Sequence, residues 1–148
     1  MNMTLFDHEK LDVYQLELRF IGWVTTLFED LKEQKVGRIA EVCDHLDRAS
    51  LSTLFNTAEG NGKRQRAIRA KYFDDARGSA TECAGCLDAF VAKRACVPER
   101  VIEGKQMLVR IVAMLTKLVQ VYSDPTRLNE DAVEYGTSPS QSSSSSSS

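Results

Sequence analysis

Apolar residues recur every three or four positions along four long stretches of the chain, and short polar or glycine-containing breaks separate these stretches. This spacing is that of amphipathic helices, because 3.6 residues make one helical turn. The pattern predicts helices over about residues 7–32, 38–60, 63–93 and 98–124. Long helices joined by short connections alternate in direction. The predicted fold class is therefore all-α, an antiparallel up-down-up-down four-helix bundle.

The breaks contain the residues that end and begin helices. Pro98 suits the first turn of the fourth helix, because an N–H at that position would have no partner inside the helix. Gly60 and Gly62 are expected to adopt positive φ and close the second helix. Pro125 ends the fourth helix, since the residue before a proline disfavours the helical conformation. We therefore place the four-helix bundle domain at residues 1–124.

From residue 125 the helical pattern is lost, and the chain ends in a run of seven serines. A segment of this composition cannot bury enough apolar surface to order itself. We predict that residues 125–148 form a disordered Ser-rich C-terminal tail.

The first and fourth predicted helices are apolar on more than one face. In the fourth, a heptad seam is flanked by further methionines and valines. A single buried face needs only one apolar stripe. The surplus predicts either a deep core or an oligomer face, and the sequence leaves both open. The two stripes of the first helix are Leu11, Tyr14, Leu18, Ile21 and Phe28, and Leu16, Phe20, Trp23, Leu27 and Leu31.

Small residues dominate the middle of the third predicted helix, where Gly78 and Gly85 lie inside the helical pattern. Glycine in a helix interior costs about 1 kcal/mol relative to alanine. Two such glycines predict that another backbone approaches closely, either from inside the bundle or from a second subunit.

Two short motifs flank the second break: Leu-Phe-Asn-Thr-Ala-Glu-Gly-Asn-Gly at 54–62 and Ala-Arg-Gly-Ser-Ala-Thr-Glu at 76–82. An Asn-x-Ala-Glu-Gly turn followed by an Ala-Arg-Gly-Ser-x-x-Glu helix resembles the four-helix-bundle protein family, also called the 23S rRNA intervening-sequence protein family. That family is related to the accessory variability determinant of diversity-generating retroelements. The matching residues are Asn56, Ala58, Glu59, Gly60, Arg77, Gly78, Ser79 and Glu82.

The resemblance implies a non-enzymatic bundle that assembles as a homopentameric barrel. Family members are encoded within intervening sequences of 23S rRNA genes or stand alone, and the retroelement relatives bind a reverse transcriptase and nucleic acid. The residues that match the family motifs are expected to be structural, since they can satisfy backbone at the turn and pair between helices or subunits. We predict in particular an ion pair between Glu59 and Arg77.

Composition and charge limit the function classes. Of the 148 residues, 43% are hydrophobic and 27% charged, and 19 basic against 21 acidic side chains leave a net charge of −2. Bulk electrostatics therefore does not attract nucleic acid, and binding needs a local patch. No apolar run is long enough to span a membrane, and the first residues lack the features of a signal peptide. We expect a cytoplasmic protein with reduced thiols and no membrane partner.

A local basic patch lies at the expected start of the third helix, where no acid occurs between Glu59 and Asp74. Cations oppose the positive end of the helix dipole, which favours a separate use for them. Phosphate contact is the obvious use, and a solvated helix start is the alternative. The candidate nucleic-acid-binding residues are Lys63, Arg64, Arg66, Arg69 and Lys71.

Cys83 and Cys86 have the C-x-x-C spacing of redox and zinc sites. Both fall mid-helix on the expected core stripe, and the chain has neither a second such pair nor paired histidines to complete a zinc site. Core packing is the expected role, with metal or redox chemistry as alternatives. The chain lacks a nucleophile motif, a phosphate loop and a Glu-x-x-His repeat, so we predict no catalytic residue and no cofactor.

The sequence supports three hypotheses about function. The leading one is a non-enzymatic homo-oligomer, a homopentamer by resemblance, that binds a macromolecular partner such as structured RNA. The first alternative is an accessory subunit that binds the reverse transcriptase of a diversity-generating retroelement. The second is a metal or redox protein that uses Cys83 and Cys86.

Overall fold

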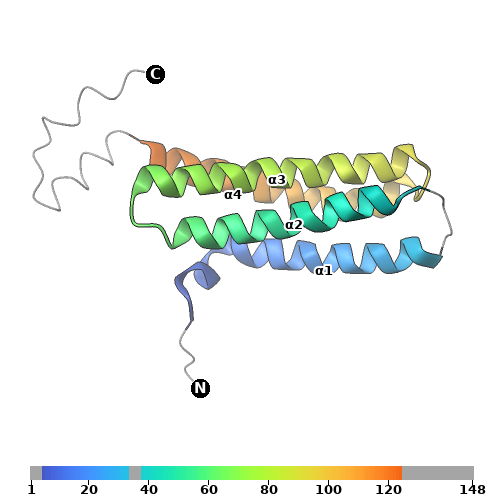
Figure 1. Cartoon of the computed structure of the whole chain (residues 1–148), viewed down its shortest axis with the longest axis horizontal. Helices are drawn as coiled ribbons and strands as arrows, with labels where there is room; N and C mark the ends of the chain where they lie inside the picture. The colour runs from blue at the N-terminus through green and yellow to red at the C-terminus, as the bar shows by residue number, and fades with distance from the viewer. Residues whose placement is uncertain (1–4, 34–37, 125–148) are drawn as a thin grey trace, which may run out of the picture.

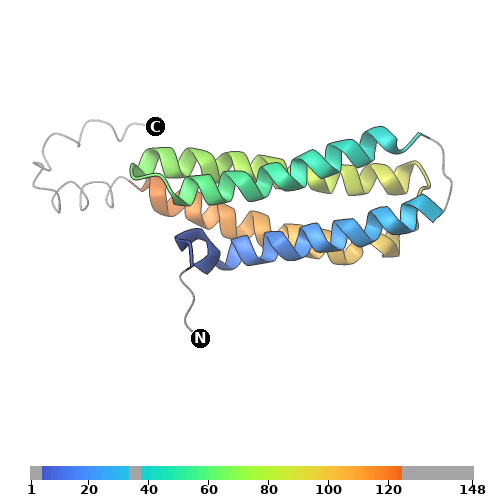
Figure 2. The same ribbon diagram turned by 60° about the horizontal axis from the view of Figure 1, so that its bottom comes forward.

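The computed structural model describes residues 5–33 and 38–124 and forms an elongated bundle of helices that lie alongside one another (Figures 1 and 2). The predicted all-α, four-helix class is confirmed for these residues. The predicted tail, residues 125–148, lies outside them. The elements are η1 (Asp7–Lys10), α1 (Asp12–Glu33), α2 (Ala40–Asn61), α3 (Arg66–Ala92), η2 (Pro98–Val101) and α4 (Ile102–Ser123), where η marks a 3₁₀ helix.

Neighbouring helices run in opposite directions, as the path of the chain in Figure 1 shows. The side-chain contacts agree with this path. Glu17 near the start of α1 meets Thr57 near the end of α2, and Lys105 near the start of α4 meets Asp88 near the end of α3. Helix α1 contacts both α2 and α4, and so it completes the enclosure of the core.

The core buries most of one apolar stripe of α1, whereas the other stripe is only partly buried. Leu16 and Leu27 are buried, whereas Leu18 is 40% exposed and Phe28 is half-buried. The core accounts for part of the second stripe, because Leu11 and Phe28 pack against it while Leu18 stays exposed. The oligomer face stays a prediction. The largest fully buried apolar side chains are Leu27, Leu46, Phe73, Leu87, Phe90, Ile111 and Leu115.

The end of α2 corrects the prediction for Gly60 and Gly62. Gly62 has φ −85°, and Gly60 is a buried helical residue. A Cβ added at Gly60 would lie 2.8 Å from the Cβ of Tyr72. Glycine is therefore required here because α3 packs closely against α2, and not because the backbone adopts a positive φ. The positive φ angles of non-glycine residues fall on Arg38 and Arg94, at 62° and 61°.

The two mid-helix glycines of α3 do not serve a close approach within the chain. A Cβ at Gly78 or at Gly85 would meet no atom within 4 Å, and both residues are exposed. The expected contact from inside the bundle is therefore absent among residues 5–33 and 38–124. Contact from a second subunit stays a prediction.

Helix starts differ from the apolar pattern by a few residues. The first turn of the expected first helix is η1, and Leu11, extended with ψ 127°, separates it from α1. The third helix begins at Arg66 because Gln65 is extended with ψ 130°. Pro98 opens the last helical segment as predicted, although its turn is the 3₁₀ helix η2.

Candidate functional site

Two of the five candidate nucleic-acid-binding residues turn inward onto α4. The guanidinium carbons of Arg66 and Arg69 each lie 4.6 Å from the centre of the Tyr122 ring. Arg66 Nη2 also donates to the backbone oxygen of Val121 at 2.8 Å, and so it satisfies a carbonyl in the last turn of α4. Cation–π contacts and charge-assisted hydrogen bonds of this kind hold the start of α3 against the end of α4.

Arg69 lies at the centre of a polar network at this end of the bundle. Its Nη2 donates to Asn61 Oδ1 at 2.7 Å and to the Tyr122 hydroxyl at 3.3 Å, and its Nη1 donates to the backbone oxygen of Lys63 at 3.1 Å. The Asn61 amide donates to the Asp7 carboxylate at 2.8 Å. The network thus joins η1, α2, α3 and α4, and it gives Arg69 a structural role.

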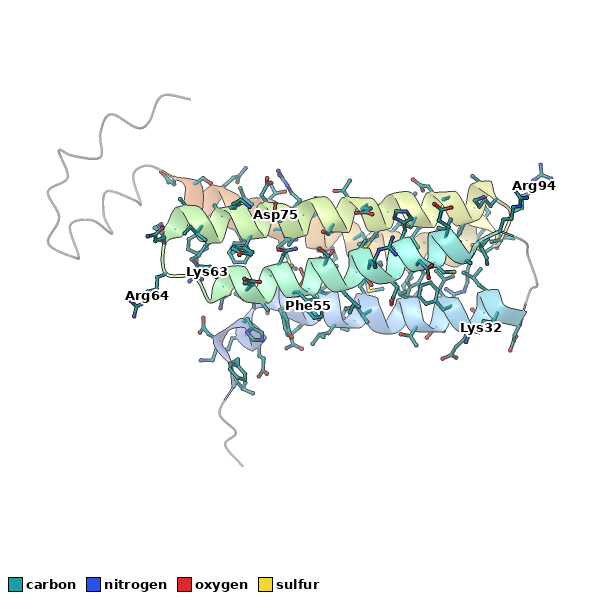
Figure 3. All side chains as sticks on the ribbon, in the orientation of Figure 1. Lys32, Phe55, Lys63, Arg64, Asp75 and Arg94 are labelled. Atoms are coloured by element: carbon teal, nitrogen blue, oxygen red, sulfur yellow. The ribbon has the colours of Figure 1, made fainter. Side chains whose placement is uncertain are left out.

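The other three residues of the basic patch lie nearer to solvent. Lys63 pairs with Glu59 at 3.6 Å and Lys71 pairs with Asp75 at 3.5 Å, in both cases one helical turn apart. Arg64 is exposed and points away from the bundle (Figure 3). Four of the five charges are therefore engaged within the chain, which leaves little of the predicted patch free for phosphate.

Several family-motif residues lie where α2 faces α3. The hydroxyls of Ser79 and Ser52 share a hydrogen bond of 2.9 Å, and the amide nitrogen of Asn56 donates to the backbone oxygen of Ser52 at 2.9 Å. Further along the same pair of helices, Glu82 meets His45 at 3.4 Å. Together with the tight contact at Gly60, the Ser52–Ser79 and His45–Glu82 pairs fix the register of α2 against α3, whereas the Asn56 bond lies within α2.

The predicted ion pair between Glu59 and Arg77 is wrong. Glu59, in the last turn of α2, contacts Lys63 instead. Arg77 pairs with Asp74 on its own helix and donates from Nη1 to the Thr116 hydroxyl of α4 at 3.3 Å. Arg77 thus faces α4 and connects α3 to that helix, whereas Glu59 lies on the opposite neighbour of α3. Two other motif residues, Ala58 and Gly78, are half-buried and exposed respectively.

Cys83 and Cys86 lie on the buried face of α3, with exposed fractions of 0% and 8%. Burial raises the pKa of the Cys83 thiol to about 12, and burial followed by the nearby Glu82 raises the pKa of Cys86. All four cysteines are free thiols. A high thiol pKa opposes both metal ligation and redox exchange, since both reactions use the thiolate. The geometry therefore supports the core-packing interpretation.

We expect Cys83 to react very slowly with a thiol reagent in the folded protein. A rise from 9.0 to about 12 lowers the thiolate population at neutral pH roughly a thousandfold, and the side chain is inaccessible as well. Titration with a disulfide reagent at pH 8, with and without denaturant, measures this. Half-buried Cys43 and Cys96 should react first and serve as the internal control. Rapid reaction of Cys83 with the reagent in the folded protein would support the redox hypothesis instead.

Glu17 is a buried carboxyl group that the apolar pattern did not single out. Its side chain is 1% exposed, the Thr57 hydroxyl donates to its Oε2 at 2.7 Å, and its Oε1 has no hydrogen-bond partner in the described part of the chain. Burial raises the pKa of Glu17 from 4.5 to about 8, against the smaller lowering effect of the Thr57 hydrogen bond. The helical spacing could have revealed that Glu17 is buried, because Glu17 lies between Val13 and Phe20 on the buried face of α1.

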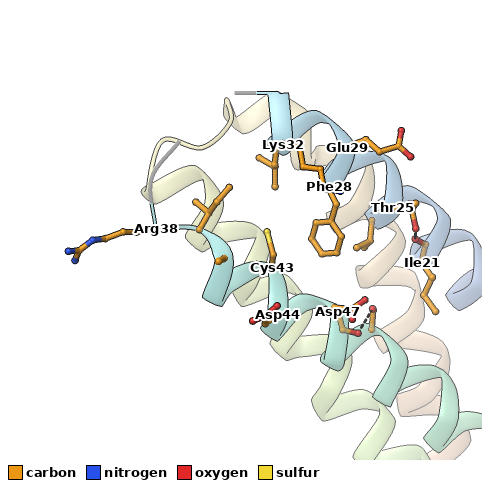
Figure 4. Close-up of a pocket in the computed structure, with 14 residues that line it drawn as sticks. Ile21, Thr25, Phe28, Glu29, Lys32, Arg38, Cys43, Asp44 and Asp47 are labelled. Carbon is orange, nitrogen blue, oxygen red and sulfur yellow. Dashed lines mark hydrogen bonds between the residues drawn. The ribbon is translucent and has the colours of Figure 1, made fainter. Parts of the chain in front are cut away.

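A groove of about 780 Å³ opens between α1 and α2, on the side where the second apolar stripe of α1 is exposed (Figure 4). The Phe28 ring projects into it from α1, and Cys43 faces it from α2. Acidic side chains of both helices border the apolar surface. The lining includes Ile21, Val24, Phe28, Leu31, Ile39 and Cys43, with Glu29, Asp44 and Asp47 among the polar residues.

Two searches of the described residues bear on the remaining site classes. No group of three or more His, Cys, Asp or Glu side chains in residues 5–33 and 38–124 is placed to hold a metal ion. In the same residues, every helix is too short or too polar to cross a bilayer.

The fold and these contacts define a class, a helical-bundle protein in which most of the conspicuous polar and motif residues join one helix to the next. The family model of the 23S rRNA-intervening sequence protein matches residues 9–117. The chain therefore belongs to the 23S rRNA-intervening sequence protein family, as its motifs indicate. Neither a curated protein nor a solved structure matches the chain.

Proposed function

We propose that this chain is a non-enzymatic assembly module that forms a homo-oligomer, a homopentamer in our expectation, and binds structured RNA. The family description refers to the intervening sequence of 23S rRNA, which favours RNA as the macromolecular partner. Such a partner places the protein in the cytoplasm. An accessory role beside a reverse transcriptase stays a prediction, because the family description does not mention retroelements.

The observation that carries the assembly is an uncovered apolar strip on α1 and α2. Phe55 is 59% exposed and Leu18 is 40% exposed. The two lie at a similar level, because Glu17, next to Leu18, bonds to Thr57, two residues from Phe55. Further along α1, Ile21, three residues after Leu18, lines the 780 Å³ groove together with Phe28. Extended apolar surface of this kind is typical of an interface, and a second copy of the chain is the occupant that we propose.

The double substitution Leu18→Asp and Phe55→Asp is expected to yield a folded monomer. Both side chains are exposed in the single chain, so the fold should tolerate the change, whereas a subunit interface cannot bury two unpaired carboxylates. Light scattering after size-exclusion chromatography measures the outcome. The wild-type protein should show five times the 16.5 kDa mass of one chain, and the variant should show a single chain mass.

Val109→Asp is the control on another helix, because Val109 is 70% exposed on α4, which the proposed α1–α2 interface does not include. It should leave the oligomer intact. A wild-type particle with the mass of one chain at micromolar concentration would reject the assembly. A double variant that keeps the wild-type mass would place the interface on another face.

A further inference from the structure

A second groove, of about 940 Å³, lies between α1 and the start of α4. It is bordered by an arginine from each helix, Arg19 from α1 and Arg110 from α4. Both side chains are exposed, and neither has a hydrogen-bond or ion-pair partner among residues 5–33 and 38–124. Two free guanidinium groups therefore border one concave surface, although they are far apart in the sequence.

Trp23 lines this groove, and several contacts hold its ring in place. The indole ring lies so close to Gly104 of α4 that an added Cβ would overlap it. Phe20 stacks against the ring with centroids 5.8 Å apart, and the Arg100 guanidinium lies 5.4 Å from its centre. Asp30 holds Arg100 in place at 2.7 Å. With these contacts made, the Trp23 ring is held in place as a support for the groove.

The contact between Trp23 and Gly104 also sets the height of the two free arginines. Arg19 lies four residues before Trp23, and Arg110 lies six residues after Gly104 on the antiparallel helix. With a rise of 1.5 Å per residue, the two arginines are level to within about 3 Å along the bundle. Glu103 is the one carboxylate in the groove lining, so the local charge is positive although the whole chain carries −2.

We propose that the α1–α4 groove binds a phosphodiester group of a nucleic-acid backbone through Arg19 and Arg110. The inference rests on the RNA partner of the proposed function and assigns a surface to it. The planar guanidinium fork donates two parallel hydrogen bonds to phosphate oxygens, which a lysine cannot match. Backbone contact of this kind is independent of base sequence.

The start of α3 is the competing surface, and its contacts make it the weaker one. Arg66 and Arg69 already bind the end of α4, and acidic neighbours pair with Lys63 and Lys71. Within the described part of the chain, only Arg64 lacks such a contact there, so a phosphate that bound more than one of these charges would have to displace existing contacts. In the groove, Arg19 and Arg110 are both free to bind.

Replacing both groove arginines with glutamine (Arg19→Gln and Arg110→Gln) tests the assignment. The probe is a fluorescein-labelled RNA hairpin with single-stranded flanks, followed by polarisation at several salt concentrations. We expect binding to weaken roughly tenfold for each arginine, and the slope of log affinity against log salt to fall by about 1.4 for two lost phosphate contacts. Lysine at both positions should restore part of the affinity, since it keeps the charge and loses the fork.

The control removes the same charge from the α3 start, with Arg64→Gln and Lys71→Gln, and should bind as wild type. If this control loses binding while the groove variant keeps it, the groove assignment is overturned and the α3 start is the site. If the wild-type protein binds no RNA, both the groove assignment and the proposed function are overturned. A DNA hairpin of the same sequence shows whether the groove prefers the RNA or the DNA backbone. Tighter binding of the DNA hairpin would overturn RNA as the ligand. A groove variant that changes oligomeric mass instead of affinity would show that a second copy occupies the groove.

Discussion

Glu17→Gln is expected to make the protein more stable at pH 8 and no more stable at pH 4.5. Glu17 is buried in α1, and its pKa is raised from 4.5 to about 8. The folded protein therefore binds a proton near neutral pH that the unfolded chain has released. Since the unfolded state binds fewer protons, the free energy of unfolding falls as pH rises through this window.

The size of the effect follows from the same shift. Below pH 4.5 both states are protonated and ionisation of Glu17 adds no cost, whereas above about pH 8 both are ionised and the full cost of ionising the buried carboxyl group is present. At about 1.4 kcal/mol per unit, the whole window amounts to on the order of 5 kcal/mol. Glutamine does not titrate, although its buried amide leaves a donor to be satisfied, at roughly 1–3 kcal/mol. The stability curves of the two proteins should therefore cross.

Urea unfolding at a series of pH values from 4.5 to 8.5, at one protein concentration, measures this crossing. The difference between variant and wild type isolates Glu17, because the other titrating groups are common to both. Glu41→Gln, the same change at an exposed position of α2, should give a curve parallel to wild type. Thr57→Val should extend the fall to higher pH, because the Thr57 hydrogen bond lowers the pKa of Glu17 in the folded protein. Parallel curves for Glu17→Gln and wild type would show that water reaches the carboxyl group.

The four helices could be predicted because their apolar periodicity is long and regular. Most of one stripe of α1 and most of the seam of α4 are buried, as that periodicity requires. The helix ends could not be predicted as well, because tertiary contacts decide them. Gln65 is extended where Arg69 bonds to Asn61 and to the backbone of Lys63, and no local signal encodes that network. Helix α3 therefore begins at Arg66 although the apolar pattern starts earlier.

The candidate site was predicted less well, for the same physical reason. Charge density along the chain marks Lys63 to Lys71, but it cannot show which charges find partners on another helix, as Arg66 does on Tyr122. The arginine groove has the opposite property. Arg19 and Arg110 are isolated in the sequence, and only the antiparallel register of α1 and α4 brings them together. The density of charged residues along the sequence reveals clusters within one helix, whereas this site is built from residues of two helices.

Gly60→Ala is expected to destabilise the protein by about 2 kcal/mol, although alanine is the better helix former. The added Cβ would lie 2.8 Å from the Cβ of Tyr72 and 3.4 Å from a ring carbon of buried Phe73. The Tyr72 Cβ is fixed to the backbone of α3, so the clash cannot be relieved by turning a flexible side chain. Helices α2 and α3 must separate, which loosens the contacts of Phe73 in the core. The free energy of unfolding in urea at pH 7 measures the loss.

Gly78→Ala is the matched control, because Gly78 is also a helical glycine of the family motif but has no atom within 4 Å of an added Cβ. It should raise the free energy of unfolding by up to about 1 kcal/mol, so the two variants should differ in sign. If Gly60→Ala leaves the free energy of unfolding unchanged, the close approach of α2 and α3 does not require glycine at this position. Gly78→Ala also probes the surface, since the single chain leaves the position open. If it instead lowers the oligomeric mass, a neighbouring subunit approaches α3 there, and the small-residue segment of α3 is part of the assembly interface.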